Sequence, residues 1–514
     1  MVADVVLFTG VRGADALFLC VLLILGAVFF LAPQDRKLPL PPGPRGLPVI
    51  GNLLDIPTKF AWRQYKKWAA EYGLDVISLK VFGQVFVVLN SHAAIKDVVL
   101  SERSGTFAGR PIIKFAELSH TNLSLIPFGD RWRARRRVVD HYFRSSSIRA
   151  YQRIQQEKVA TAMRRLLQKP DGFVGHAREY TAAIVLSVIY GYDVKEPDEP
   201  LVLVGDEVNT NGSGSLVPGA LLVNMFPPLG ELPHWMLGVR FARLVEQQTR
   251  QHRWMMQEPF EEVKAGVRNG TAKPSLVRDS LTKLPEGDIE TELTHIQALG
   301  SAFIGPYLSC RISTIMTFVL AMVLNPDVQM KARTEIDAVV GRDRLPIFED
   351  RPHLPYINAL VMEVLRWAPP PIFTGVPHRA EQDVVRGSYC IPEGATVFGN
   401  AWAILHDPEA YRDPEAFKPE RFLSEDGKEV LDDPILDYIF GFGLRKCPGR
   451  HIADATVWLF IASMLAVFEV SKNRAADIHT DEPFSGTGMV IRPLPFRCLI
   501  APRDEQAQRI IQHT

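Results

Sequence analysis

The segment at residues 440–450, FGFGLRKCPGR, constrains this 514-residue chain more than any other stretch. Its cysteine, Cys447, stands among basic residues and glycines, just before an apolar run that predicts a long helix starting near Ile452. Glycines permit a tight loop with a close backbone approach, and backbone N–H groups with Arg445 and Lys446 would stabilise a thiolate. Such a thiolate acts as a nucleophile or as a metal ligand. A merely structural buried cysteine would not need these glycines and basic residues.

The composition argues against several other classes of protein. The formal net charge is zero, so bulk charge predicts no nucleic acid or other strongly charged partner. Five cysteines are scattered without CxxC spacing, which argues against a disulfide scaffold or a structural zinc site and suits a reducing compartment. The length allows about two or three ordinary domains or one large one.

An uncharged apolar run at residues 16–32 is long enough to cross a bilayer as a helix. A signal peptide is the alternative, but its apolar core is usually shorter and ends at a cleavage site of small residues. Arg36, Lys37 and Arg45 follow the run, whereas only Arg12 precedes it closely. The positive-inside rule therefore predicts a single-pass anchor with the rest of the chain in the cytosol.

The remaining chain predicts one large, mostly α domain with small β-sheets. Prolines make residues 38–52 a stiff extended strap. Alternating apolar residues predict strands around residues 75–90, and strands return near 389–400. Helical periodicity dominates between these two strand regions, and a final long helix is expected over residues 451–470. The predicted units are a short N-terminal segment (1–15), the anchor (16–32), the strap (33–52) and the globular body (53–514).

The cysteine segment also carries a family resemblance. The pattern F-x-x-G-x-R-x-C-x-G is matched by Phe440, Gly443, Arg445, Cys447 and Gly449, and the chain is thereby identified as a member of the cytochrome P450 family. The resemblance implies a single cytochrome P450 fold that binds heme b, with the Cys447 thiolate as the axial ligand of the iron. This thiolate pushes electron density onto the iron and favours O–O cleavage.

Two further motifs stand in the order that the resemblance implies. The sequence EVLR gives Glu363 and Arg366, which are i, i+3 neighbours on a helix and can pair. The sequence PERF supplies Arg421. Such a pair alone is usually a solvated helix pair, but the resemblance implies that these three residues form a buried triad that holds the scaffold.

Four residues are candidates to bind the carboxylates of the haem. Trp132 and Arg136 lie one helical turn apart, and the resemblance implies that they contact one propionate. His378 and Arg445 are candidates for the same role, because buried carboxylates need cationic or hydrogen-bonding partners. The alternatives are a solvated basic helix around Arg136 and a purely structural His378.

The helix expected to cover the haem departs from the family pattern [AG]-G-x-[DE]-T-[TS], whose acid and threonine pass protons. The pattern falls on PYLSCR, residues 306–311, with Ser309 at the acid position and Cys310 at the threonine position. A slip of one residue would place Ser309 on the threonine, and in both alignments a carboxylate is missing. Pro306 predicts a kink. Arg311 would need an anionic substrate group, or it points away and pairs with a neighbouring acid.

The resemblance implies a microsomal haem-thiolate monooxygenase in the endoplasmic reticulum membrane, with a cytosolic catalytic domain. It would oxidise a small lipophilic molecule with O2 and electrons from NADPH–cytochrome P450 reductase. Residues 400–423 resemble fungal members that modify secondary metabolites of terpenoid or polyketide type. The altered segment keeps two alternatives open, namely haem-thiolate chemistry other than monooxygenation and a catalytically inactive haem-binding protein. The reductase is expected to dock on a basic face made by Arg133, Arg135, Arg137 and Lys446.

Overall fold

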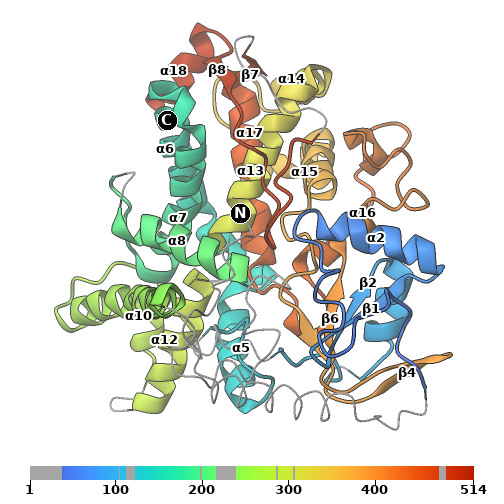
Figure 1. The fold of residues 1–514 in the computed structure, drawn as a ribbon. Helices are drawn as coiled ribbons and strands as arrows, with labels where there is room; N and C mark the ends of the chain where they lie inside the picture. Colours follow the sequence, from blue (N-terminus) through green and yellow to red (C-terminus); the bar gives the residue numbers. More distant parts are fainter. Residues whose placement is uncertain are drawn as a thin grey trace.

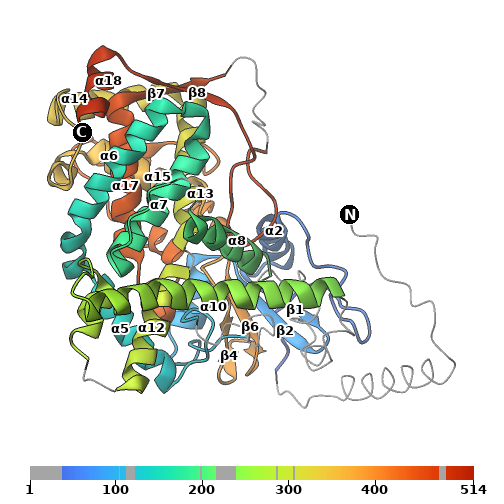
Figure 2. The same cartoon turned by 90° about the vertical axis from the view of Figure 1, so that its left-hand side faces the viewer.

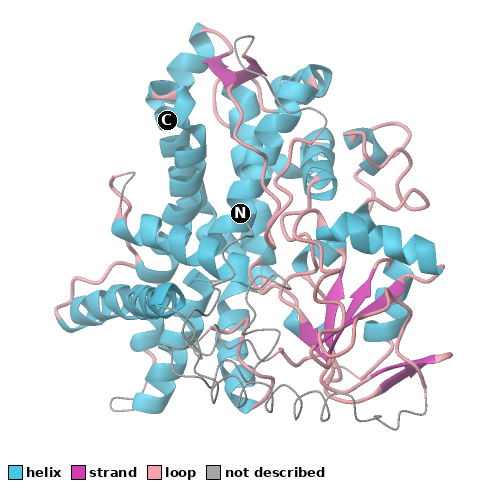
Figure 3. Ribbon diagram, viewed as in Figure 1, coloured by secondary structure: helices cyan, strands magenta, loops and turns pink. Residues whose placement is uncertain are grey.

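The computed structural model describes residues 38–103, 105–111, 122–196, 199–215, 239–284, 288–304, 307–473 and 482–514. Helices dominate this described part, and its strands form three small sheets (Figure 1 and Figure 3). The predicted fold class, mostly α with small β-sheets, is confirmed. The predicted anchor at residues 16–32 lies outside the described residues.

The α-helices of the described part vary from single turns to a helix of 30 residues, α10. Figure 2 shows α10 crossing next to α8 and α12. The bounds are α2 (Ala61–Tyr72), α3 (His92–Ile95), α5 (Asp130–Phe143), α6 (Gln152–Gln168), α7 (Phe173–Tyr190), α8 (Pro200–Ser215), α10 (Val239–Arg268), α11 (Leu276–Leu281), α12 (Ile289–Ile304), α13 (Tyr307–Leu324), α14 (Pro326–Val339), α15 (Pro355–Trp367), α16 (Ala401–Leu405), α17 (Arg450–Val467) and α18 (Glu505–His513).

The largest sheet has the strand order β1-β2-β6-β3. It pairs strands from residues 76–89 with strands from residues 378–399, which precede the cysteine loop. β1 (Val76–Val81) and β2 (Gln84–Leu89) form a hairpin in the region predicted to contain strands. Phe82 and Gly83 turn it with φ of 47° and 85°, as a two-residue hairpin of this type requires. β6 (Thr396–Gly399) then pairs in parallel with β2 and antiparallel with β3 (His378–Arg379).

Two smaller sheets pair β4 (Val384–Arg386) with β5 (Tyr389–Ile391), and β7 (Phe468–Lys472) with β8 (Cys498–Pro502). The second pair corrects the expected end of the last long helix, which stops at Val467 rather than at Val470. The backbone of Val470 pairs with Ile500 in the sheet instead of continuing the helix. The sequence patterns also missed α18, whose N-cap Asp504 accepts a hydrogen bond from the backbone N–H of Ala507 at 2.9 Å.

Helix α17 forms the centre of the core and holds the cysteine loop in place. It packs against α6, α13, α14 and α15, and it lies beside α13 in Figure 1. Among the described helices it is the one that is by itself long and apolar enough to span a membrane, but most of it is buried inside the protein. This burial is typical of the core helix of a globular domain.

The proline-rich strap lies along the sheets and is held through its carbonyl groups. The carbonyl oxygens of Pro41 and Pro42 accept hydrogen bonds from the side chain and the backbone N–H of Ser78, at 2.6 and 2.8 Å. The carbonyl of Pro39 accepts one from the N–H of Cys390 at 2.8 Å. A Cβ on Gly43 would come within 1.9 Å of the Ser78 carbonyl oxygen, so the close approach requires glycine.

Candidate active site

The cysteine loop, residues 440–449, fixes the position of Cys447 three residues before α17 begins. The N–H of Cys447 donates to the carbonyl oxygen of Phe440 at 2.8 Å, and the Arg450 guanidinium donates to the Cys447 carbonyl at 3.2 Å. Gly441 and Gly443 have φ of 77° and 59°, values that favour glycine. The loop is therefore closed on itself, and the direction of the thiol is set by the backbone.

The surroundings of the Cys447 sulfur act on its protonation in opposite directions. Burial raises the pKa of the thiol, while the backbone N–H of Gly449 and the charges of Arg311, Arg136 and Arg450 lower it. Removal from water disfavours the thiolate, and nearby donors and cations favour it. Coordination to a metal ion would complete the deprotonation.

A mostly apolar cavity of about 250 Å³ lies next to Cys447. Residues of α5, α7, α12, α13, α15, β3, α17 and the cysteine loop line it. The described lining residues include four arginines, Arg110, Arg136, Arg311 and Arg445, and a single carboxylate, Asp454. Because Asp454 is paired with Arg351 at 2.7 Å, the cavity carries an excess of positive charge and suits an anionic ligand.

Arg445 is buried, and hydrogen bonds to backbone carbonyl oxygens hold its guanidinium in place. It donates to the carbonyl oxygens of Ala108 at 2.8 Å and Ile126 at 2.9 Å, and its guanidinium lies 4.5 Å from the Trp132 ring centroid. Burial lowers the pKa of Arg445 to about 10, so it stays charged at neutral pH.

Arg110 is a site residue that the sequence patterns missed. It is buried and donates to the carbonyl oxygens of Ser124 and Val376, each at 2.8 Å. Burial and the charge of Arg445 hold its pKa well below the ordinary value. The available signal was weak, because Arg110 is one basic residue in an apolar stretch and no spacing marks it.

Trp132 and Arg136 both lie on α5 and line the cavity. The Arg136 side chain is 14% exposed and pairs with Asp140 at 2.8 Å. Arg135 corrects the expected basic face: it is 3% exposed and donates to Gln297 of α12. Arg135 lies three residues after Trp132 and four residues before Val139, so the three side chains share one side of α5. Arg135 therefore faces the protein rather than solvent.

His378 is buried at the edge of the cavity and its ring is stacked on Phe442, with 4.5 Å between the centroids. Its Nδ1 lies 2.6 Å from the carbonyl oxygen of Phe107 and therefore carries the proton. Burial and the charge of Arg110 hold its pKa well below the ordinary value. In this neutral form Nε2 has no proton to donate, so His378 would bind a carboxylate only after gaining a second proton.

These residues fit an iron porphyrin with two carboxylates. Cys447 would supply the sulfur ligand, and Arg110, Arg136 and Arg445, which line the same cavity, would supply positive charge for the carboxylates. A Cβ on Gly449 would contact only the side chain of Ile452, at 4.0 Å, so the backbone beside the sulfur leaves space for a flat ligand.

Replacing Arg136 with glutamine is expected to speed the loss of haem about tenfold, because one charge-assisted hydrogen bond to a buried carboxylate is lost. The measurement is the rate of haem transfer to an acceptor protein. The matched control is Arg133→Gln on the same helix, since Arg133 is 52% exposed and pairs with Asp130. Equal haem loss from the two variants would contradict a role of Arg136 in haem binding.

The structure brings Glu363, Arg366 and Arg421 together, and it buries the first two completely. Arg366 donates to both carboxylate oxygens of Glu363 at 2.7 and 2.9 Å, and Arg421 lies 3.1 Å from the same carboxylate. The backbone N–H of Lys418 adds a hydrogen bond to Glu363 at 2.7 Å. The carbonyl of Ala416 accepts from both arginines. We therefore expect the three residues to hold the chain segment at 412–421 on α15.

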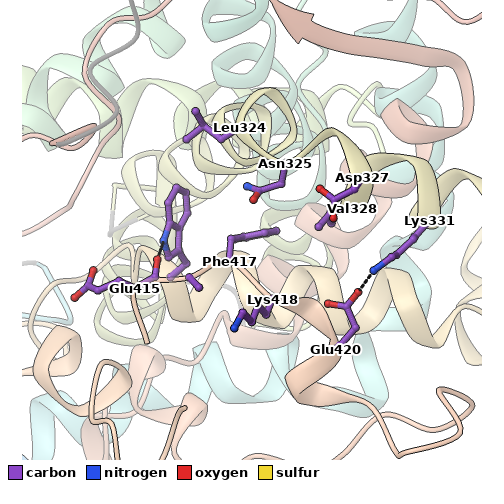
Figure 4. A pocket seen from close by; sticks show the side chains of 11 residues that line it. Leu324, Asn325, Asp327, Val328, Lys331, Glu415, Phe417, Lys418 and Glu420 are labelled. Atoms are coloured by element: carbon purple, nitrogen blue, oxygen red, sulfur yellow. Dashed lines mark hydrogen bonds and ion pairs between the residues drawn. The ribbon is translucent and has the colours of Figure 1, made fainter. Parts of the chain in front are cut away.

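A second pocket borders this segment (Figure 4). Lys331 and Glu420, which line this pocket, form an ion pair that Figure 4 marks with a dashed line. The indole N–H of Trp367 donates a hydrogen bond to the carbonyl oxygen of Glu415 at 3.0 Å. Both partners of the ion pair are about half exposed, at 54% and 45%. Its described lining contains no cysteine or histidine, and we assign no chemistry to this pocket.

The segment expected over the haem falls at the junction of α12, which ends at Ile304, and α13, which begins at Tyr307. Pro306, with its expected kink, and the side chain of Ser309 lie outside the described residues. Cys310 and Arg311 line the cavity. Burial raises the pKa of Cys310 to about 12, so it is a neutral thiol at physiological pH. Arg311 is 6% exposed and lies at the cavity rather than on the protein surface.

Comparison with known proteins agrees with this site. The family model described as cytochrome P450 matches residues 41–500. A cytochrome P450 monooxygenase of Armillaria gallica is 37% identical over 490 residues, covering 93% of this chain and 94% of the relative. The tryptamine 4-monooxygenase of Psilocybe cyanescens is 33% identical over 501 residues, covering 94% of this chain and 97% of the relative. With the buried cysteine loop and the positively charged cavity, these matches place the chain in the cytochrome P450 monooxygenase family.

Proposed function

We propose that this enzyme inserts oxygen from O2 into a small lipophilic molecule, by hydroxylation, epoxidation or successive oxidations. The observation that carries the proposal is the mostly apolar cavity that is lined by Cys447 and by arginines. When bound there, a haem with a thiolate ligand supplies the oxygen activation. The chain itself supplies the thiolate, the charges that hold the cofactor and the apolar walls that exclude water.

We further propose electron supply from NADPH through NADPH–cytochrome P450 reductase, and anchoring in the endoplasmic reticulum membrane by residues 16–32. The relatives are fungal, and one of them is named for the oxidation of tryptamine. This supports a small molecule of fungal secondary metabolism as the substrate, and the narrower proposal of a terpenoid or polyketide rests on the resemblance of residues 400–423.

The test uses the full chain in microsomes with the reductase. A carbon monoxide difference spectrum should show the haem-thiolate band, and NADPH should be consumed with a candidate substrate and O2. Comparing the metabolites of a host with and without the gene would identify the substrate. A protein that shows the thiolate band but consumes no NADPH with any candidate would contradict the monooxygenase activity.

Proton delivery is where this enzyme departs from its family. In one of the two alignments Cys310 stands where the family pattern has threonine, in both of them the carboxylate is missing, and the buried Cys310 thiol is a weak hydrogen-bond donor. We propose that water, the Ser309 hydroxyl or a substrate hydroxyl delivers protons instead.

Replacing Cys310 with threonine is expected to lower peroxide release per NADPH consumed about twofold or more, because a hydroxyl donates a better hydrogen bond than a thiol. Ser309→Ala should raise peroxide release if the Ser309 hydroxyl takes part. The measurement is peroxide formed against NADPH consumed, with product quantified in parallel. Unchanged, tightly coupled turnover in Ser309→Ala would rule out the role of Ser309.

A second candidate function is haem-thiolate chemistry without external oxygen, such as rearrangement, dehydration or peroxide use. The carboxylate that is missing in both alignments of residues 306–311 favours it. Product formation that needs neither NADPH nor O2 would identify this chemistry. A protein that binds haem and converts no candidate substrate under either condition would instead be a haem-binding protein without catalysis.

A further inference from the structure

Asp454 is the one carboxylate among the described residues that line the cavity next to Cys447. It lies in the second turn of α17, seven residues after Cys447 in the chain. A negative charge that lines the cavity disfavours the uptake of an electron by a haem bound there, because like charges repel. The charge of this carboxylate therefore has to be compensated if the haem iron is to be reduced easily.

Arg351 supplies this compensation from a different part of the chain. It belongs to the 3₁₀ helix η5 (Phe348–His353), and its guanidinium donates to both carboxylate oxygens of Asp454, at 2.7 and 3.1 Å. The guanidinium also donates to the side-chain oxygen of Asn358 at 3.3 Å and lies 5.3 Å from the centroid of the Trp458 ring of α17. The carboxylate is thus held in the two-bond geometry that an arginine provides and a point charge does not.

The same ion pair affects the partner of Arg450. Arg450 and Asp454 are i, i+4 neighbours on α17, a spacing at which opposite charges can pair. The Arg450 guanidinium instead donates to the carbonyl oxygen of Cys447 at 3.2 Å. Burial and the charge of Arg450 lower the pKa of the adjacent His451, and the charge of Asp454 raises it, so the two charges act at the same place. Without Arg351, Asp454 would be able to draw Arg450 away from the cysteine loop.

We propose that Arg351 is a positioning residue that holds the Asp454 carboxylate and thereby sets the reduction potential of the haem iron. The proposal rests on the proposed haem-thiolate function and names residues that govern how readily the iron takes up an electron. The pair is partly exposed, at 29% for Arg351 and 37% for Asp454. Pairs exposed to this extent contribute little to folding stability, so variants of both residues should remain folded and their potentials can be compared.

The test measures the potential rather than turnover. The haem-loaded full chain is titrated between its oxidised and reduced forms without substrate, and the haem absorption band gives the ratio of the two. Arg351→Gln leaves Asp454 uncompensated and should shift the reduction equilibrium about three- to tenfold toward the oxidised form. Asp454→Asn leaves Arg351 uncompensated and should shift the equilibrium by a similar factor toward the reduced form. For a one-electron couple, a tenfold shift corresponds to about 59 mV.

A double variant separates this electrostatic role from a merely structural one. Arg351→Gln combined with Asp454→Asn is neutral, as the original pair is, and should return the potential to near that of the unmodified enzyme. Arg351→Lys keeps the charge and should keep most of the potential. The matched control is Arg344→Gln, because Arg344 donates to both oxygens of Asp350 at 2.7 Å, and the described lining of the cavity includes neither residue. This control should leave the potential unchanged.

A carbon monoxide spectrum of every variant shows whether the thiolate haem is present. Absence of the thiolate band from the unmodified enzyme would overturn the proposed function, and this proposal with it. With the band present, this proposal alone is overturned if the two single variants shift the potential in the same direction or leave it unchanged, or if Arg344→Gln shifts it as far as Arg351→Gln. If Arg351→Gln does not take up haem, Asp454→Asn must still raise the potential and the double variant must still restore it, and failure of either overturns the proposal.

Discussion

Replacement of Cys447 by alanine is expected to abolish the haem-thiolate spectrum and to reduce oxidation of any substrate to background. Cys447 is the cysteine that the closed loop points at the cavity, and its sulfur is the proposed axial ligand. Without that sulfur, a bound haem would lack the electron donation that favours O–O cleavage. The measurement is the carbon monoxide difference spectrum of the purified variant, with turnover in the presence of reductase.

Cys310→Ala is the matched control for this prediction, because both thiols line the same cavity. That variant should keep the thiolate band, since Cys310 lies on α13 rather than in the cysteine loop. Retention of the band in Cys447→Ala, or its loss in Cys310→Ala, would show that the ligand had been assigned to the wrong cysteine.

Replacement of Glu363 by alanine is expected to destabilise the folded protein by about 3–5 kcal/mol, the usual cost of leaving buried charges uncompensated. Glu363 and Arg366 are both 0% exposed, and Arg421 shares the same carboxylate. Because folded domains are stable by only about 5–15 kcal/mol, little holoprotein should accumulate. The measurements are the yield of haem-containing protein and the denaturant midpoint of the fraction recovered.

The comparison for Glu363→Ala is Lys331→Ala, which breaks the half-exposed ion pair with Glu420 shown in Figure 4. Exposed pairs contribute about 0–1 kcal/mol, so this variant should fold with a nearly unchanged midpoint. Similar midpoints for the two variants would mean that the buried carboxylate is not what holds the segment at 412–421 in place.

Motif spacing predicted those parts of the site that lie close together in sequence. The cysteine loop and the pair of Glu363 and Arg366 depend on local geometry, so their residues could be named in advance. Arg110 could not, because its place in the cavity depends on contacts with carbonyls of distant segments. The same holds for the end of α17 at Val467, which is set by pairing with β8 some 30 residues later.

The expectation that Arg135 lies on an exposed basic face is wrong. Its spacing from Trp132 and Val139 places it on their buried side, and this spacing can be read from the sequence. The neutral state of His378 follows from burial and from neighbouring arginines of other segments. No motif in the sequence could have shown it.

The hydrogen bonds that the carbonyl groups of the proline strap accept have a mechanical consequence. Pro41 and Pro42 are held by Ser78 of β1, and Pro39 by Cys390 of β5. A force applied to the chain at residue 38 is therefore transmitted to β1 and β5 through these hydrogen bonds. The strap thus fixes the path that the chain takes over the two sheets from residue 39 to residue 42.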